Sequence, residues 1–214
     1  MNDISEYDDK DFKLKITLVG NSSVGKTSLI FQYMNNSFND IKIATIGCDK
    51  FSTSITINNR EIKLSIWDTA GQERFRSLSQ MFLKNTDICI LIYDITNENS
   101  FVDIQKYWLG LVKDNLSNII IALVANKTDL YPEEVVNEET GRNFAEKEGI
   151  YFYMTCAKEY KTISNVFNDL VTKYIEKYGF THNQSMSDTS ILEREQSINS
   201  VSEQNKKIKK ACCN

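Results

Sequence analysis

The sequence predicts an α/β fold, with six strands in a mostly parallel sheet, one antiparallel edge strand and five surrounding helices. Strand-like and helix-like segments alternate along residues 11–178, and such alternation is typical of a parallel sheet with crossover helices. Two neighbouring strand-like segments are separated only by a short turn, which predicts a hairpin and hence one antiparallel pair. Three further segments are continuously apolar, as strands covered on both faces are: ICILIY (88–93), IIIALVA (119–125) and YFYMTC (151–156).

The remaining elements follow from their periodicity. The first strand is expected at residues 12–19, where FKLKITLV alternates apolar and polar residues. The hairpin pairs FSTSITI (51–57) with EIKLSIW (61–67) around the turn Asn58-Asn59-Arg60. The clearest helix is the last one. Its apolar residues recur at the helical spacing along one face: Ile163, Val166, Phe167, Leu170, Val171, Tyr174, Ile175 and Tyr178.

Composition excludes several classes of protein. A hydrophobic content of 41% suffices for a full core, and a net charge of −4 argues against a dedicated nucleic-acid binder. The sequence has no run of 18 apolar residues, so no transmembrane helix is expected. The scattered cysteines Cys48, Cys89 and Cys156 suit neither a disulfide scaffold nor a zinc site, which favours a reducing cytoplasm. The single histidine, His182, lies in a polar stretch, so a histidine triad in the folded body is excluded.

Three regions are expected along the chain. Residues 1–10 are acidic and polar, which predicts a disordered leader rather than a signal peptide. Residues 11–178 form the folded domain. Residues 179–214 are rich in Ser, Asn, Gln and charge, and such a composition buries too little apolar surface to fold.

The segment GNSSVGKT, Gly20 to Thr27, predicts a phosphate-binding loop. It matches G-x-x-x-x-G-K-[ST] between a predicted strand and a predicted helix, the context that the motif requires. Its glycines let consecutive N–H groups converge on an anion, and the helix N-terminus adds positive potential. Lys26 is expected at the β- and γ-phosphates, with the Thr27 hydroxyl on Mg²⁺. The nucleotide-binding residues of this segment are Ser23, Val24, Gly25, Lys26, Thr27 and Ser28.

Two segments that follow buried strands select the base. In NKTD, Asp129 can accept two hydrogen bonds from guanine, whereas adenine would leave the carboxylate unpaired. This disfavours an ATP-dependent kinase or ATPase. In TCAK, a backbone N–H is expected to bind the guanine O6. The base-site residues are Asn126, Lys127, Asp129, Cys156, Ala157 and Lys158.

Two further segments contain residues suited to the γ-phosphate. In WDTAGQE, Asp68 is expected beside the metal, the Gly71 amide near the phosphate, and Gln72 on the attacking water. In ATIG, the Thr45 hydroxyl can bind Mg²⁺ while the γ-phosphate holds this segment closed. Both segments are expected to order with GTP and to loosen after hydrolysis.

Together, GNSSVGKT, TIG, WDTAGQERF, NKTD and CAK resemble the Ras superfamily of small GTPases, and WDTAGQERFRSL, YDITN and the final cysteine pair resemble its Rab branch. The resemblance implies the P-loop GTPase fold and a GTP/GDP switch in vesicle traffic. It implies that Phe38 packs against the guanine, that Lys26 and Gln72 are catalytic, and that Thr27, Thr45 and Asp68 serve the metal. It also implies an exchange factor, an activating protein, a dissociation inhibitor and an escort protein as partners.

Three positions depart from the family pattern. Lys42 replaces an aromatic residue that usually covers the phosphates. Lys50 replaces a phenylalanine of a three-residue effector surface whose other positions match Trp67 and Phe82, so partner choice should change more than nucleotide binding. Cys156 replaces a serine, with little effect expected, because the base is read there mainly by backbone N–H.

Hydrolysis is expected to be slow without a partner. No arginine finger is identifiable, and Arg74 and Arg76 are more typical of solvated or partner-facing residues. Activation in trans is expected to be on the order of 10³- to 10⁵-fold. The alternative is a guanine-nucleotide-dependent binding scaffold with negligible hydrolysis, for which Lys42 and Lys50 leave room.

The end of the sequence, KKIKKACCN, predicts lipidation. Ala211 occupies the position that a CaaX cysteine would need, so the Cys212-Cys213 pair instead resembles the Rab double-geranylgeranyl signal. A metal clip would need further ligands, and a redox pair would need a folded pocket. Two lipid chains give stable anchoring, which the four nearby lysines can assist on an anionic leaflet. The expected location is the cytoplasmic face of a secretory or endocytic membrane, with cycling through the cytosol.

Overall fold

Six strands form one sheet in the computed structural model, which describes residues 12–37, 45, 47–71 and 81–180. The strand order is β2-β3-β1-β4-β5-β6. All neighbours pair in parallel except β2 and β3, so the predicted sheet with one antiparallel edge strand is confirmed. The strands are β1 (Phe12–Val19), β2 (Cys48–Ile57), β3 (Arg60–Thr69), β4 (Ile88–Asp94), β5 (Ile120–Asn126) and β6 (Tyr151–Thr155).

The hairpin turn between β2 and β3 is tighter than predicted. Asn58 and Asn59 both have positive φ, at 52° and 61°, and Arg60 already pairs with Ile57. Two central residues of positive φ are typical of a type I′ turn, whose twist matches that of the flanking strands. Strand β2 also begins three residues before the predicted start, because Cys48 pairs with Thr69 although the local sequence does not alternate.

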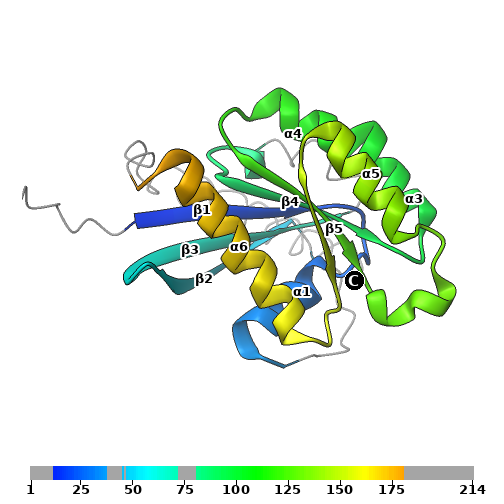
Figure 1. The fold of residues 1–214 in the computed structure, drawn as a ribbon, viewed down its shortest axis with the longest axis horizontal. Coiled ribbons are helices and arrows are strands. Elements are labelled where there is room, and N and C mark those ends of the chain that lie inside the picture. The colour runs from blue at the N-terminus through cyan, green and yellow to red at the C-terminus, as the bar shows by residue number, and fades with distance from the viewer. Residues whose placement is uncertain (1–11, 38–44, 46, 72–80, 181–214) are drawn as a thin grey trace, which may run out of the picture. The chain divides into compact units, whose positions relative to one another are not determined.

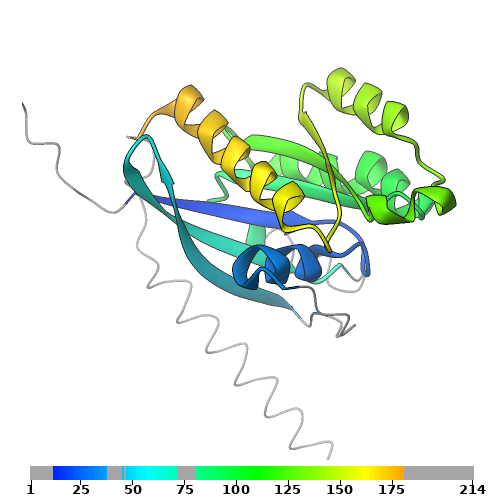
Figure 2. The same ribbon diagram turned by 60° about the horizontal axis from the view of Figure 1, so that its bottom comes forward.

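Helices cover both faces of the sheet (Figures 1 and 2). One face carries α1 (Lys26–Asn35) and α6 (Tyr160–Tyr178). The other carries a continuous helical segment and α5 (Glu138–Glu148). That segment consists of α3 (Glu98–Asp103), the π-helix η2 (Ile104–Trp108) and α4 (Leu109–Asn115). A 3₁₀ helix, η3 (Thr128–Glu133), follows β5. The helix predicted between the third and fourth strands falls largely on residues 72–80, outside the described part of the chain.

Two apolar cores explain the continuous apolar runs. In β4, Ile88, Ile90 and Ile92 pack toward α1 and α6, whereas Cys89, Leu91 and Tyr93 pack toward the opposite helices. A strand covered on both faces needs apolar residues at every position, which is why these runs do not alternate. The face predicted for the last helix is confirmed, with Ile175 and Tyr178 only partly buried near its end.

Within the described residues, no helix is long and apolar enough to cross a membrane. Among the described residues, Cys48, Cys89 and Cys156 form no disulfide. Burial raises the pKa of the Cys89 thiol far above its ordinary value, which makes this residue an unreactive part of the core.

Candidate functional site

The predicted site segments meet at one edge of the sheet. The phosphate loop follows β1, Asp68 lies near the end of β3, NKTD straddles the end of β5, and TCAK follows β6. These four strands run in the same direction, so their carboxyl ends lie at the same edge. Ligands of open α/β sheets bind at that edge.

The phosphate loop has the backbone of an anion-binding nest. Ser23 and Gly25 have positive φ, at 64° and 97°, on either side of the buried Val24. Helix α1 begins at Lys26, and no side chain caps its N-terminus. Left-handed residues in such a loop turn peptide N–H groups inward, and the helix end adds its dipole. The loop is therefore suited to phosphate oxygens.

Lys26 is held inside this loop. Its Nζ donates to the carbonyl oxygens of Gly20, at 2.9 Å, and Asn21, at 2.7 Å, and only 5% of the residue is exposed. Burial lowers the pKa of Lys26 to about 8, against the opposing attraction of the Asp68 carboxylate. An anion that binds beside a buried ammonium of this kind stabilises its charged form.

Three oxygen-bearing side chains from separate segments meet next to Lys26. Thr27 Oγ1 donates to Asp68 Oδ2 at 2.5 Å, and Thr45 Oγ1 donates to the same oxygen at 3.1 Å. The two hydroxyl oxygens are 2.9 Å apart. Asp68 is fully buried, and its Oδ1 has no hydrogen-bond partner within the described residues. Burial raises the pKa of Asp68, although the hydrogen bond from Thr27 and the charge of Lys26 oppose this.

This cluster matches the donor chemistry of a hard divalent cation, which prefers carboxylate and hydroxyl oxygens. An unpaired buried carboxylate oxygen is costly unless a cation or donor meets it. The described residues hold no group of three or more His, Cys, Asp or Glu side chains suited to a metal, so a cation here depends on the threonines. The structure thus brings together Thr27, Thr45 and Asp68, the three residues that the sequence suggests for the metal.

Gly71 lies directly against the phosphate loop. A Cβ added to it would lie 2.2 Å from the Asn21 carbonyl carbon and 2.4 Å from the Ser22 nitrogen. Only glycine permits this approach between two backbone segments. The turn after β3 is therefore packed on the loop where the phosphates are expected.

Asn126 links the predicted base site to the phosphate loop. Its Nδ2 donates to the Val24 carbonyl oxygen at 2.8 Å, and its Oδ1 accepts from Thr155 Oγ1 at 3.0 Å. The residue is 1% exposed. A Cβ at Gly25 would lie 2.4 Å from Nδ2, so glycine is also needed there.

Asp129 is paired with two residues of TCAK. Lys158 Nζ donates to Oδ2 at 2.5 Å, and Cys156 Sγ lies 3.4 Å from Oδ1. Burial alone would raise the pKa of Asp129, but the hydrogen bonds from Lys158 and Cys156 leave it below its ordinary value. The carboxylate is thereby kept ionised, as an acceptor of two guanine N–H groups must be. Ala157 between them is buried in the core under α1 and α6.

Sequence reasoning missed two residues that support the site. Asp94 ends β4, and its Oδ2 lies 2.6 Å from Nζ of Lys127, a residue with a left-handed backbone conformation. YDITN contains this aspartate, but only the parallel pairing of β4 with β5 brings it to NKTD. Asn21 is the second residue of GNSSVGKT, but the motif itself gives this position no role.

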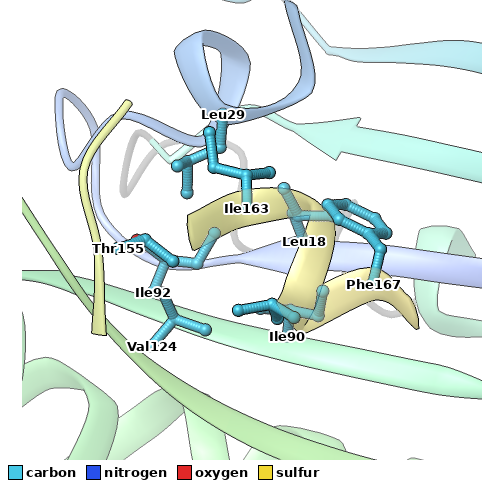
Figure 3. Close-up of a pocket in the computed structure, with 9 residues that line it drawn as sticks. Leu18, Leu29, Ile90, Ile92, Val124, Thr155, Ile163 and Phe167 are labelled. Carbon is cyan, nitrogen blue, oxygen red and sulfur yellow. The ribbon is translucent and has the colours of Figure 1, made fainter. Parts of the chain in front are cut away.

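Figure 3 shows a small cavity with a mainly apolar lining in the core. A cavity of about 10 Å³ lies beneath the loop between α1, α6 and the sheet, and it is lined mainly by Leu18, Leu29, Ile92, Ile163 and Phe167. A cavity of this size has room for about one water molecule, and its lining offers few polar partners. The cavity is a packing gap of the core, so all ligand chemistry belongs to the loops above it.

The predicted effector positions lie together on the antiparallel part of the sheet. Lys50 and Trp67 are register partners on β2 and β3, and Lys50 Nζ lies 5.6 Å from the Trp67 ring centroid. The Phe82 ring centroid is 6.4 Å from that of Trp67. Phe51 instead packs against Phe31 of α1, with ring centroids 5.6 Å apart, so it does not replace the missing aromatic residue.

Several predicted residues lie outside the described part of the chain. They are Phe38, Lys42, Gln72, Arg74, Arg76, His182, Cys212 and Cys213. Ser28 is described and lies in the first turn of α1.

Comparison with known proteins decides the family. The model of the Ras family matches residues 15–176, which is most of the chain. The chain belongs to the Ras family. Human Ras-related protein Rab-3A is 40% identical over 167 residues, covering 78% of this chain and 76% of the relative. Human Ras-related protein Rab-30 is 40% identical over 171 residues, covering 79% and 84%. Rab-3 of Caenorhabditis elegans is 38% identical over 167 residues, covering 78% and 76%.

The chain is accordingly a Rab-type small GTPase, which binds guanine nucleotides and hydrolyses GTP. The alternative of a scaffold with negligible hydrolysis has no support from these relatives.

Proposed function

We propose that this GTPase is a membrane-anchored switch in vesicle-mediated transport, which binds GTP or GDP together with Mg²⁺ and hydrolyses GTP slowly. The observation that carries the proposal is the contact of Thr27 and Thr45 with one buried oxygen of Asp68. It links the phosphate loop, the ATIG segment and the end of β3 through a single donor set. A γ-phosphate that alters the contacts among these three side chains would also shift the ATIG segment and the turn after β3.

We assign the metal to Thr27, Thr45 and Asp68. When bound, Mg²⁺ would neutralise charge that develops on the phosphate oxygens. The ammonium of Lys26, held by two loop carbonyls, would direct its remaining N–H at the β- and γ-phosphate oxygens. The backbone N–H of Gly71 would meet the γ-phosphate, and Gln72 would orient the attacking water.

For base recognition we assign Asp129 to the N1–H and 2-amino groups of guanine. Asn126 braces the loops, the Lys127 stem lies along the purine and Phe38 packs at its edge. Lys158 and Cys156 hold Asp129 in place and ionised. The loop residues Ser23, Val24, Gly25 and Ser28 bind the phosphates.

Hydrolysis measured in a single turnover tests the catalytic part of the proposal. Wild type should hydrolyse bound GTP slowly, and Gln72→Leu should be slower by about tenfold or more, because its side chain cannot orient water. Gln105→Leu makes the same change at an exposed helical position and should behave as wild type. Equal rates for Gln72→Leu and wild type, with chelation of Mg²⁺ also without effect, would refute the assigned roles.

We propose three regions of different function. Residues 11–178 form the GTPase domain, and residues 1–10 and 179–214 are a leader and a tether. The tether is lipidated at Cys212 and Cys213, which places the domain at the cytoplasmic face of a secretory or endocytic membrane. Exchange factor, activating protein, dissociation inhibitor and escort protein regulate that cycle, and effectors bind the surface around Lys50, Trp67 and Phe82.

The anchor is tested in cells by fractionation and by the mass of the purified chain. Cys212→Ser with Cys213→Ser should move the protein to the cytosol, because one or two lipid chains supply its membrane affinity. Each single variant should lose one prenyl mass and part of the membrane pool. Cys48→Ser, a thiol change outside the tail, should leave the distribution unchanged. A double variant that stays on membranes would exclude this anchor.

A further inference from the structure

The side chain of Asn21 is clamped from two sides. Its Nδ2 donates to Asp103 Oδ2 at 2.8 Å, and its Oδ1 accepts from Trp108 Nε1 at 2.9 Å. A carboxylate only accepts hydrogen bonds and an indole N–H only donates them, so this pair of partners fixes the orientation of the amide.

Both clamping residues belong to one continuous helical segment. Asp103 is the last residue of α3, and Trp108 is the last residue of the π-helix η2. The Trp108 side chain is fully buried, and its indole N–H, its only polar group, is satisfied by Asn21. A π-helical turn widens a helix locally and is frequent at functional sites. Here it places Asp103 and Trp108, five positions apart, against the same amide.

The backbone of Asn21 contacts two parts of the reaction site. Its carbonyl oxygen accepts the 2.7 Å hydrogen bond from Lys26 Nζ. Its carbonyl group is also the surface on which Gly71 packs, because a Cβ at Gly71 would lie 2.2 to 2.3 Å from these two atoms. Fixing the side chain therefore fixes a peptide that both Lys26 and the turn after β3 use as a support.

We propose that Asn21 is a positioning residue for GTP hydrolysis, held by Asp103 and Trp108 so that its peptide keeps Lys26 and Gly71 in register with the phosphates. The inference rests on the proposed roles of Lys26 and Gly71 and goes beyond them, because Asn21, Asp103 and Trp108 need not touch the nucleotide. It connects the phosphate loop to the helical segment on the opposite face of the sheet. Small displacements of a positioned group cost much of its effect on rate.

An exchange of the amide and the carboxylate tests the clamp. Asn21→Asp places two carboxylates together and removes the donor to Asp103. We expect its single-turnover hydrolysis rate constant to fall about tenfold, the scale of one lost buried hydrogen bond. Asp103→Asn added to this variant restores a donor opposite the new carboxylate, which still accepts from Trp108. The double variant should return to within about threefold of wild type.

Further measurements separate positioning from general damage to the fold. Dissociation of a fluorescent GDP analogue should change by less than about threefold in Asn21→Asp, because the clamp supports the reaction more than ground-state binding. Trp108→Phe removes the indole N–H together with part of the buried ring, and it should also slow hydrolysis. Asp114→Asn, the same type of change at an exposed position on α4, should match wild type.

The outcomes distinguish the inference from the proposed function. Wild-type hydrolysis together with unchanged hydrolysis in Asn21→Asp or in Trp108→Phe would overturn the clamp. A folded double variant that stays as slow as Asn21→Asp would do so as well. A wild-type chain that binds no GTP would overturn the proposed function itself, and the clamp with it.

Discussion

The side chain of Asn126 is hydrogen-bonded to the backbone of Val24, 102 residues earlier in the sequence, through a 2.8 Å contact from Nδ2 to the carbonyl oxygen. Asn126 ends β5 and opens the segment proposed to recognise the base, whereas Val24 belongs to the loop proposed to bind the phosphates. The contact is buried, and Thr155 holds the other end of the amide. The proposed base site and the proposed phosphate loop are therefore joined directly by the protein.

Asn126→Ala should weaken both the fold and the nucleotide site. It leaves the buried Val24 carbonyl and the Thr155 hydroxyl without this partner, and an unsatisfied buried polar group costs about 1–3 kcal/mol. We expect the free energy of unfolding to fall by about that amount and GDP to dissociate at least about tenfold faster. Denaturant titration and release of a fluorescent GDP analogue measure the two effects. Asn115→Ala removes an exposed amide from the end of α4 and should change neither.

Lys26 should give nucleotide binding a dependence on pH. Its pKa in the nucleotide-free protein is about 8, below the ordinary 10.5, whereas phosphate favours the charged ammonium. As the pH rises from 7 to 8.5, more of the free protein holds neutral lysine, so binding must take up a proton and the affinity for GDP must fall. Calorimetry in buffers of different ionisation enthalpy measures the proton uptake. Lys26→Met should bind weakly and lose this uptake, and an equal uptake in both proteins would exclude Lys26 as its source.

The lowered pKa of Lys26 affects the stability of the fold in the opposite direction: nucleotide affinity falls as the pH rises, whereas the contribution of Lys26 to stability increases. Because the folded pKa lies below the unfolded one, the unfolded chain binds more protons between about pH 8 and 10.5. The contribution of Lys26 to the unfolding free energy of the nucleotide-free protein therefore increases with pH in that window. Lys26→Met removes this contribution, so the difference between the two titration curves isolates it.

Gly71→Ala should impair GTP hydrolysis much more than GDP binding, because it displaces the turn after β3. The new methyl group would lie 2.2 Å from the Asn21 carbonyl carbon, a backbone atom that cannot rotate away. The turn after β3 must then move from the loop, so we expect GTP hydrolysis to fall by about 10²-fold, while GDP affinity changes far less. Single-turnover hydrolysis and GDP release measure this. Gly110→Ala is the control, because a Cβ there meets nothing within 4 Å and alanine favours its helix. Unimpaired hydrolysis in Gly71→Ala would contradict this role of the turn.

The central part of the sheet followed from the sequence because β4 and β5 are buried on both faces. Apolar runs such as ICILIY identify strands covered on both faces, and the Asn58-Asn59 pair marks the hairpin. The start of β2 at Cys48 was not predictable, since its first residues pair with β3 without an alternating pattern. Tertiary pairing outweighs local propensity at such a position.

The sequence predicted those site residues that belong to a recognisable motif, but not the contacts between motifs. Thr27, Thr45 and Asp68 could be grouped from the sequence because the three motifs that contain them all imply the same ligand, Mg²⁺. The pairing of Lys158 with Asp129 and of Lys127 with Asp94 was not expected, because no local pattern encodes which strand ends become neighbours. Asn21 is 82 residues from Asp103 and 87 residues from Trp108 in the sequence. These contacts therefore become visible only when the helical segment is placed against the phosphate loop.

Lys50 should determine partner choice through its contact with Trp67. The two residues are register partners on an antiparallel pair, where side chains on one face lie close together. Lys50 Nζ lies 5.6 Å from the indole ring, and Lys15 Nζ lies 4.2 Å from it, so cations occupy the surroundings of this aromatic residue. An effector that covers this surface must offer an acceptor or a carboxylate to Lys50, since a buried unpaired ammonium costs several kcal/mol.

Lys50→Phe should therefore exchange one set of partners for another without altering the switch. GDP release and GTP hydrolysis should remain within about twofold of wild type, because the described contact of Lys50 is with Trp67, which has no assigned role in nucleotide binding. Proteins retained by the GTP-loaded chain, compared quantitatively with those retained by the GDP-loaded chain, should differ between Lys50→Phe and wild type. Lys147→Phe places the same change on the exposed face of α5 and should retain the wild-type set. Identical GTP-dependent partners for Lys50→Phe and wild type would show that specificity lies elsewhere on the surface.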